Sequence, residues 1–281
     1  MREIAAELIE KTVCDLILQA NYAIGPDVRQ AVEAACAAEL SQAGRAVLGQ
    51  LLENYDIARS ERVAICQDTG LCVIFLDVGQ DVHIIGGDLQ AALSSATRRA
   101  YTAGYLRKSM VRDPLYDRVN TGDNTPPIVH TRIVPGEHIG ILVTPKGIGS
   151  ENMSAVKMLM PADGEAGVID FVVDTVRRAG PNPCPPVIVG VGIGSTLEGA
   201  ALLAKRMTAR SLDAENPDPR YAALEKKMLQ RINALGIGPA GIGGRCTALR
   251  VHIAAAPTHI GGLPVAVNLC CHAARHAHAV L

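Results

Sequence analysis

The sequence predicts an α/β fold of mixed α+β type, in which a helical N-terminal region (residues 1–58) packs on an α/β body with a mixed sheet (residues 59–281). Two observations support this prediction. Apolar residues in the first region recur every three or four positions, which is the spacing of one helix face. After Arg62 the pattern changes to short β-branched runs, separated by glycines and interleaved with amphipathic stretches. No low-complexity linker divides the chain, so we expect residues 1–281 to form a single domain.

The individual elements follow from the same periodicities. In the helical region Pro26 is placed to open a second helix. Further helices are expected at 89–103, 167–178 and 197–207, in a charged stretch ending at Leu235, and at 272–281. Strands are expected at 63–66, 72–78, 186–193, 251–256 and 264–269. The runs 129–134 and 139–143 flank Pro-Gly-Glu and predict a hairpin, and Ser150 is a candidate cap for a helix that follows a glycine loop.

Composition excludes several classes of protein. The net charge is −1, which argues against a nucleic-acid partner, and two Phe, six Tyr and no Trp make aromatic-lined sites a poor expectation. The first twenty residues carry four acidic side chains, unlike a signal peptide, and no apolar run approaches the roughly 20 residues that cross a bilayer. We therefore expect a cytoplasmic location without membrane contact, where the eight cysteines are thiols or metal ligands.

Three of these cysteines occupy unusual positions. Cys66, Cys184 and Cys271 lie in Gly/Pro-rich turns or at the end of a β-like run, and their wide separation excludes a local Cys-x-x-Cys pair. Prolines flank Cys184 and stiffen its loop. The helix expected after Cys271 would favour its thiolate. The other five, which are expected to pack or to lack a metal-binding role, are Cys14, Cys36, Cys72, Cys246 and Cys270.

Three thiolates around one inorganic centre would leave one metal position without a protein ligand. Structural zinc sites normally have four ligands in local pairs, which are absent here. An iron–sulfur cluster with three thiolates would keep one iron free to act as a Lewis acid. A zinc-binding or cluster-binding scaffold without catalytic activity remains an alternative.

Several polar residues lie near these cysteines or in glycine loops. Gln67 and Asp68 directly follow Cys66, and His259 lies in a loop before the strand that leads to Cys271. The segment Lys-Gly-Ile-Gly-Ser-Glu-Asn (146–152) could bind an anion through its amides, although it lacks the Walker pattern. Gly-Val-Gly-Ile-Gly (190–194) matches a dinucleotide-binding loop only weakly, because the expected acidic residue is missing.

Six segments together resemble the class I, iron–sulfur fumarate hydratases, and more narrowly the alpha subunit of their two-subunit form. The related tartrate dehydratase alpha subunit shares the Cys-Gln-Asp-Thr-Gly and Cys-Pro-Pro elements. The resemblance runs from about residue 5 to the C-terminus. Its segments are Ile-Cys-Gln-Asp-Thr-Gly, Asn-Thr-Gly-Asp-Asn-Thr-Pro, Pro-Lys-Gly-Ile-Gly-Ser-Glu-Asn-Met-Ser, Asn-Pro-Cys-Pro-Pro-Val-Ile-Val-Gly, Pro-Thr-His-Ile-Gly-Gly and Cys-His-Ala-Ala-Arg.

The resemblance implies a [4Fe-4S] cluster and reversible hydration of fumarate to (S)-malate. Its cluster ligands map onto Cys66, Cys184 and Cys271. Its substrate contacts map onto Gln67, Asp68, Gly149 and His259, and more loosely onto Arg107. Asp68 is the candidate in this chain for proton handling. The resemblance also implies a separate beta subunit that completes the site for a small dicarboxylate, in a hetero-oligomer or dimer. Dehydration of tartrate or another hydroxydicarboxylate remains open.

Overall fold

The computed structural model describes all residues from 1 to 281 and confirms the predicted α/β class. The chain forms two compact units, and each contains part of the N-terminal helical region. The first unit consists of Met1–Gly25, Tyr55–Ile148 and Arg275–Leu281, and the second of Pro26–Asn54 and Gly149–Ala274. None of the helices combines the length and the apolar character that crossing a bilayer requires.

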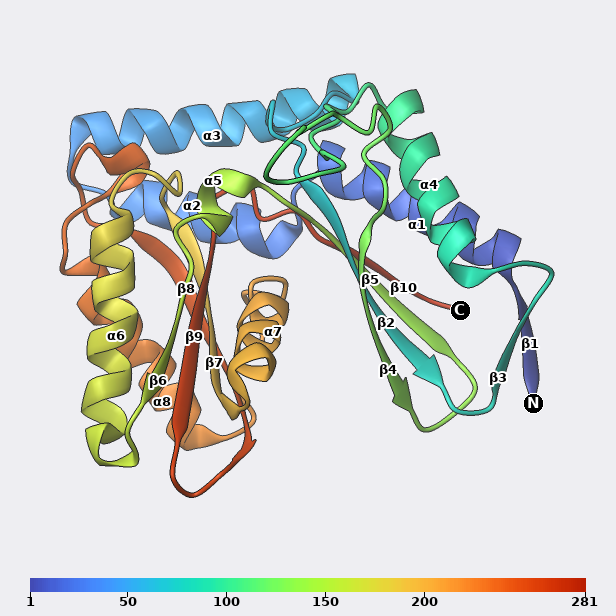
Figure 1. The fold of residues 1–281 in the computed structure, drawn as a ribbon. Helices are drawn as coiled ribbons and strands as arrows, with labels where there is room; N and C mark the ends of the chain where they lie inside the picture. Colours follow the sequence, from blue (N-terminus) through green and yellow to red (C-terminus); the bar gives the residue numbers. More distant parts are fainter. The chain divides into compact units, whose positions relative to one another are not determined.

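The first unit is built on a four-stranded sheet with the order β10-β5-β2-β4 (Figure 1). Two helices, α1 (Ala6–Tyr22) and α4 (Leu89–Ala103), pack on this sheet and bury Ile17, Leu93 and Tyr101 against the strands. The strands are β2 (Leu71–Gly79), β4 (Ile128–Val134), β5 (Ile139–Lys146) and β10 (Ala277–Val280), and a separate parallel pair joins β1 (Arg2–Ala5) to β3 (Val82–Ile85).

The hairpin expected at 129–143 is wrong, because β2 lies between β4 and β5. Strand β2 pairs in parallel with β4 and antiparallel with β5. The physical reason is burial. The run Leu-Cys-Val-Ile-Phe-Leu of β2 is almost wholly buried, whereas β4 is largely exposed, so the more apolar strand takes a central position and β4 the edge.

The second unit is built on a sheet with the order β6-β9-β7-β8. Helices α6 (Gly164–Ala179) and α8 (Pro219–Asn233) contribute to the apolar core on one face, and α7 (Leu197–Met207) packs on the other (Figure 1). The strands are β6 (Ala155–Leu159), β7 (Val187–Ser195), β8 (Ala248–Thr258) and β9 (Leu263–Cys270). The remaining helices are α2 (Pro26–Ala38), α3 (Gln42–Glu61) and α5 (Ile148–Glu151), with short 3-10 turns at Pro161–Asp163 and Pro239–Gly241.

The glycines of Gly-Val-Gly-Ile-Gly serve close packing in the second unit. Gly190 and Gly192 lie within β7, directly under α7. A Cβ on Gly190 would stand 2.1 Å from the Ala204 carbonyl oxygen, and one on Gly192 would stand 2.0 Å from that of Ala200. Both distances are far below van der Waals contact, so the alternating glycines let a helix backbone approach the strand.

Three local expectations are wrong. Residues 63–66 form no strand, because the Val63 and Ile65 amides donate to helical carbonyl oxygens instead of to a sheet. Residues 272–281 contain no helix, since Ala277–Val280 extends the first sheet as β10 beside β5. Ser150 lies inside the single turn of α5 instead of at the position before its first residue. For Ile65 and for β10, a partner far away in the sequence outweighed the local preference.

Candidate metal centre

In the first unit, a rigid turn carries Cys66, Gln67 and Asp68. The Asp68 carboxylate accepts hydrogen bonds from the amide of Gly70, at 3.0 Å, and from that of Ile148, at 2.9 Å. Gly70 has a φ of +77° and lies against the backbone of Lys146, where a Cβ would clash, so only glycine fits. The turn is thus held at both ends, with the Cys66 sulfur 3.5 Å from the Gln67 amide oxygen.

Arg107 is brought beside this turn by its backbone. It follows α4, and its carbonyl oxygen accepts a hydrogen bond of 3.0 Å from the Thr69 hydroxyl. The Tyr101 hydroxyl, at the end of α4, donates to the Gly70 carbonyl oxygen at 2.9 Å. The first unit therefore gathers four of the predicted site residues: Cys66, Gln67, Asp68 and Arg107.

Arg275 holds the same turn, and sequence reasoning did not single it out. Its side chain is buried, and its Nη1 donates to the Asp68 carbonyl oxygen at 2.7 Å and to the Asn21 side-chain oxygen at 3.3 Å. The one sequence feature that could have pointed to Arg275 is its place at the end of the Cys-His-Ala-Ala-Arg segment. A buried guanidinium requires hydrogen-bond acceptors, so the turn and the arginine stabilise each other.

In the second unit, Cys184 and Cys271 lie in two loops that touch. Cys184 is exposed and adopts a left-handed backbone conformation, with a φ of +55°, which is uncommon for a residue with a side chain. Its carbonyl oxygen accepts a hydrogen bond of 3.4 Å from the amide of His272. The start of β7 and the end of β9 lie together, since Ile188 pairs with Cys270. Cys271 follows β9 in an irregular loop, so no helix dipole acts on its thiol.

Gly149 lies at the same end of this sheet. A Cβ added to it would stand 3.7 Å from the Asn182 carbonyl oxygen, in the loop that carries Cys184. The second unit therefore brings together Gly149, Cys184 and Cys271, which belong to three segments that are far apart in the sequence.

The remaining cysteines are poorly suited to bind a metal. Burial raises the pKa of Cys72 to about 12, and burial also raises the pKa of Cys246 to about 12, with Glu39 adding to the effect. Cys14 packs in the first core, as predicted, and burial raises its pKa as well. High pKa values disfavour thiolates, and the thiolate is the form that binds metals. No group of three or more His, Cys, Asp or Glu side chains is placed to hold a single metal ion.

His259 lies at the opposite end of the second sheet from Cys271. It stands in the loop between β8 and β9, and the eight residues of β9 separate it from Cys271. A strand of that length spans about 25 Å. His259 instead borders a pocket of about 500 Å³, which is also lined by Ile193, Arg220 and Tyr221. The position of His259 therefore does not support the expectation that it reaches the cysteines of its own chain.

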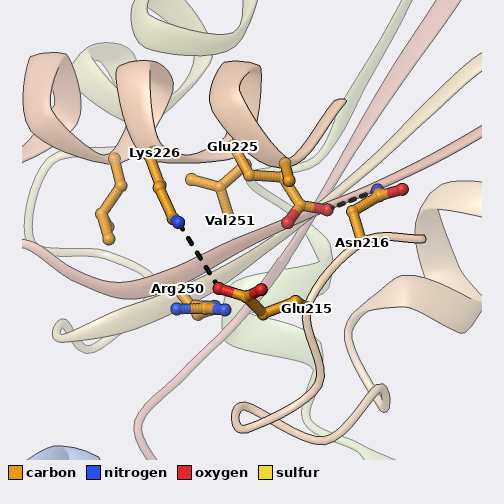
Figure 2. A pocket seen from close by; sticks show the side chains of 8 residues that line it. Glu215, Asn216, Glu225, Lys226, Arg250 and Val251 are labelled. Atoms are coloured by element: carbon orange, nitrogen blue, oxygen red, sulfur yellow. Dashed lines mark hydrogen bonds and ion pairs between the residues drawn. The ribbon is translucent and has the colours of Figure 1, made fainter. Parts of the chain in front are cut away.

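A second cavity in this unit has a structural role. It measures about 10 Å³, enough for one water molecule, and lies beside Glu225 and Arg250 (Figure 2). The buried Glu225 carboxylate accepts hydrogen bonds from Asn216 at 2.8 Å, Arg210 at 3.0 Å and the Ile253 amide at 2.8 Å. These bonds tie the segment before α8 to β8, and the space is too small for a dicarboxylate.

Comparison with known proteins identifies the family. Residues 10–280 match the fumarate hydratase (fumerase) family. The putative L(+)-tartrate dehydratase subunit alpha of Methanocaldococcus jannaschii is 37% identical over 275 residues, which cover 96% of each chain. The L(+)-tartrate dehydratase subunit alpha of Escherichia coli K12 is 36% identical over 242 residues, which cover 85% of this chain and 79% of that protein. These matches confirm the resemblance drawn from the motifs. The chain belongs to the fumarate hydratase family of hydro-lyases.

Proposed function

We propose that this chain is the alpha-type subunit of a hydro-lyase that adds water to fumarate and removes it from (S)-malate. The observation that carries the proposal is the gathering of site residues in each unit. One turn of the first unit presents Cys66 with Gln67, and one end of the second sheet presents Cys184 with Cys271 and Gly149. The matching family is that of fumarate hydratase, and the chain has a cysteine at each ligand position that the motif resemblance implies.

Cys66, Cys184 and Cys271 are proposed to hold one [4Fe-4S] cluster. The donor set supports this, because all three thiols are at least partly exposed, unlike the buried Cys14, Cys72 and Cys270. When bound, such a cluster supplies one iron without a protein ligand, which can polarise a hydroxyl or carboxylate oxygen as a Lewis acid.

The other residues have distinct roles in the proposal. The Arg107 guanidinium and the Gly149 amide bind substrate carboxylates, and the Gln67 side chain orients the hydroxyl. Asp68 is the candidate in this chain for holding a proton. Each of its carboxylate oxygens already accepts one backbone amide, so one further lone pair on each remains for a substrate proton. We place the principal base on a beta-type partner subunit, in line with the alpha-subunit names of the relatives.

His259 is proposed to serve the site of a second copy of this chain. The separation along β9 prevents it from reaching Cys271 of its own chain. Its ring is nevertheless prepared for binding, because Nδ1 accepts the Gly261 amide at 3.1 Å and the neutral ring then carries its proton on Nε2. That proton lies on an exposed loop tip, where Ile260 is 92% exposed. A site shared between copies makes the alpha chain at least a dimer.

The test is an anaerobic assay of the chain produced together with a beta-type subunit. After cluster reconstitution, consumption of fumarate with formation of (S)-malate supports the proposal. A fully reconstituted complex that leaves fumarate, malate and tartrate unchanged would refute it. Zinc at about one per chain, without iron, would indicate the scaffold alternative instead.

L(+)-tartrate dehydration is a second candidate, because both relatives described above carry that name. The two reactions differ at one carbon, where tartrate carries a second hydroxyl group. Parallel measurement of kcat/KM for malate and tartrate on the same complex decides between them, and the substrate with the higher value identifies the activity.

A further inference from the structure

We propose that Glu151 is a positioning residue, clamped by Lys205 and Asn268, that holds the glycine loop 149–154 beside Cys184 and Cys271. The effect on substrate binding rests on the proposed function, because it assumes that the Gly149 amide binds a carboxylate. The effect of the clamp on the position of the loop does not depend on that function.

The clamp joins three elements of the second unit. Glu151 is the last residue of α5, and its Oε1 forms an ion pair with the Lys205 ammonium group of α7. Its Oε2 accepts a hydrogen bond of 3.0 Å from the Asn268 side-chain amide of β9. The Glu151 and Lys205 side chains are only 28% and 20% exposed. Partial burial strengthens such a pair relative to a fully exposed one.

The loop is tied to β9 at a second point. The Ser154 hydroxyl accepts the Leu269 amide at 3.1 Å, and the Ser154 amide donates to the Glu151 carbonyl oxygen at 3.0 Å. These bonds continue the line of the β6–β9 pairing, whose last partners are Ala155 and Val267. The loop therefore crosses β9 within two residues of Cys271, and a shift of Glu151 would move it relative to that cysteine.

The choice of Asn at position 268 is not explained by the stability of the fold. The residue is only 6% exposed, and its Oδ1 is buried without a hydrogen-bond partner. It is on the face of β9 where Ala266 packs against Ala200 and Ala204 of α7. An unpaired buried carbonyl costs about 1–3 kcal/mol, so an apolar side chain of similar size would suit the fold better. The contact that Asn268 provides is the one to Glu151.

Close packing of α7 places Lys205. Gly190 and Gly192 let the backbone of α7 lie directly on β7, and Lys205 follows Ala204 at the contact. A residue with a Cβ at either glycine would lift the helix and move the ammonium group away from Glu151. The ion pair between Lys205 and Glu151 thus depends on the glycines of β7, because they set the position of α7.

The charges of the clamp also predict how variants behave. Lys205 neutralises Glu151 close to a loop that is proposed to bind a dianion. Without the lysine, an uncompensated carboxylate would repel the substrate and would lose its fixed position. Removal of both charges abolishes the repulsion, and a glutamine at this position can still accept the Asn268 hydrogen bond. Glu151→Gln in the Lys205→Met background should therefore recover substrate binding in part.

The first measurement is hydrogen exchange of the peptide that spans 148–155, made on the full chain without substrate. Asn268→Leu and Lys205→Met should each accelerate exchange of the Met153 and Ser154 amides at least about tenfold, since both amides are protected by bonds inside the loop. The thermal midpoint of Asn268→Leu should stay the same or rise. The control is Lys227→Met, which removes an exposed ion pair with Glu165. Exchange rates equal to wild type in both clamp variants would overturn the proposal.

The second measurement is steady-state kinetics of the cluster-loaded complex. Lys205→Met should raise KM for the dicarboxylate about tenfold with a smaller change in kcat, and the double variant should return KM toward wild type. An unchanged KM despite faster exchange would overturn the assignment to substrate positioning. An inactive wild-type complex whose clamp variants still exchange faster would refute the proposed function and leave the loop-positioning role supported.

Discussion

Cys184 differs from Cys36 in both exposure and backbone conformation. It is exposed on a left-handed residue, whereas Cys36 is half-buried in α2 with its thiol 3.7 Å from the Arg45 carbonyl oxygen. We predict that Cys184→Ser abolishes the broad visible absorbance of the reconstituted cluster, because an alcohol ligates iron poorly at neutral pH. The spectrum and the iron content after anaerobic reconstitution measure the effect. Cys36→Ser is the matched control and should keep both, so equal loss in the two variants would argue against a ligand role for Cys184.

At the scale of elements, the contact of α7 with β7 depends on the absence of side chains. We predict that Gly192→Ala lowers the free energy of unfolding by about 3 kcal/mol or more, because its Cβ would stand 2.0 Å from the Ala200 carbonyl oxygen. Urea unfolding measures the change. Gly49→Ala in α3 meets nothing within 4 Å and should be neutral or stabilising by up to about 1 kcal/mol. A Gly192→Ala protein as stable as wild type would disprove the close-packing explanation.

Strand β8 contains a buried histidine that should make the fold sensitive to acid. His252 is fully buried, neither ring nitrogen has a hydrogen-bond partner, and burial lowers its pKa to about 3, with Arg210 and Arg250 adding to the effect. Below the ordinary histidine pKa of about 6.5, His252 binds a proton in the unfolded chain but stays neutral in the folded chain. The free energy of unfolding therefore falls as the pH drops toward 3. The slope from this group is about 1.4 kcal/mol per pH unit.

The prediction is checked by urea unfolding at several pH values between 7 and 4.5. His252→Leu removes the titrating group and should show a shallower loss of stability with acid than wild type. His278 in β10 is exposed and serves as the control, since His278→Leu should keep the wild-type slope. Parallel curves for wild type and His252→Leu would contradict the assignment.

For the whole molecule, the position of His259 predicts complementation between chains. His259→Ala and Cys184→Ser should each inactivate the enzyme alone. When both are produced together with the beta-type subunit, half of randomly formed alpha dimers are hybrids with one intact site, which gives about a quarter of wild-type activity. Hydratase activity of the purified mixture is the measurement. Mixed complexes as inactive as the parents would exclude a shared site.

Much of the site chemistry could be predicted from local sequence. The local sequence singles out the cysteines in Gly/Pro-rich turns and the amide and carboxylate that follow Cys66. It also predicts the strand and helix around 186–207, and α7 begins and ends where expected. The hairpin at 129–143 and the helix at 272–281 were wrong because β2 and β5 provide partners from elsewhere in the chain. The role of Arg275 was hidden because a buried arginine shows no distinctive spacing.

The sequence alone determined the family, most of the longer elements and the set of candidate thiols, because these depend on local periodicity and on short motifs. Only the tertiary structure decided which residues meet. Strand order and direction place Gly149, Cys184 and Cys271 at one end of a sheet and His259 at the other, although His259 is nearer in sequence to Cys271 than Cys184 is. The physical reason is that a strand carries the chain away from a point at about 3.3 Å per residue, while pairing between strands returns distant segments to it.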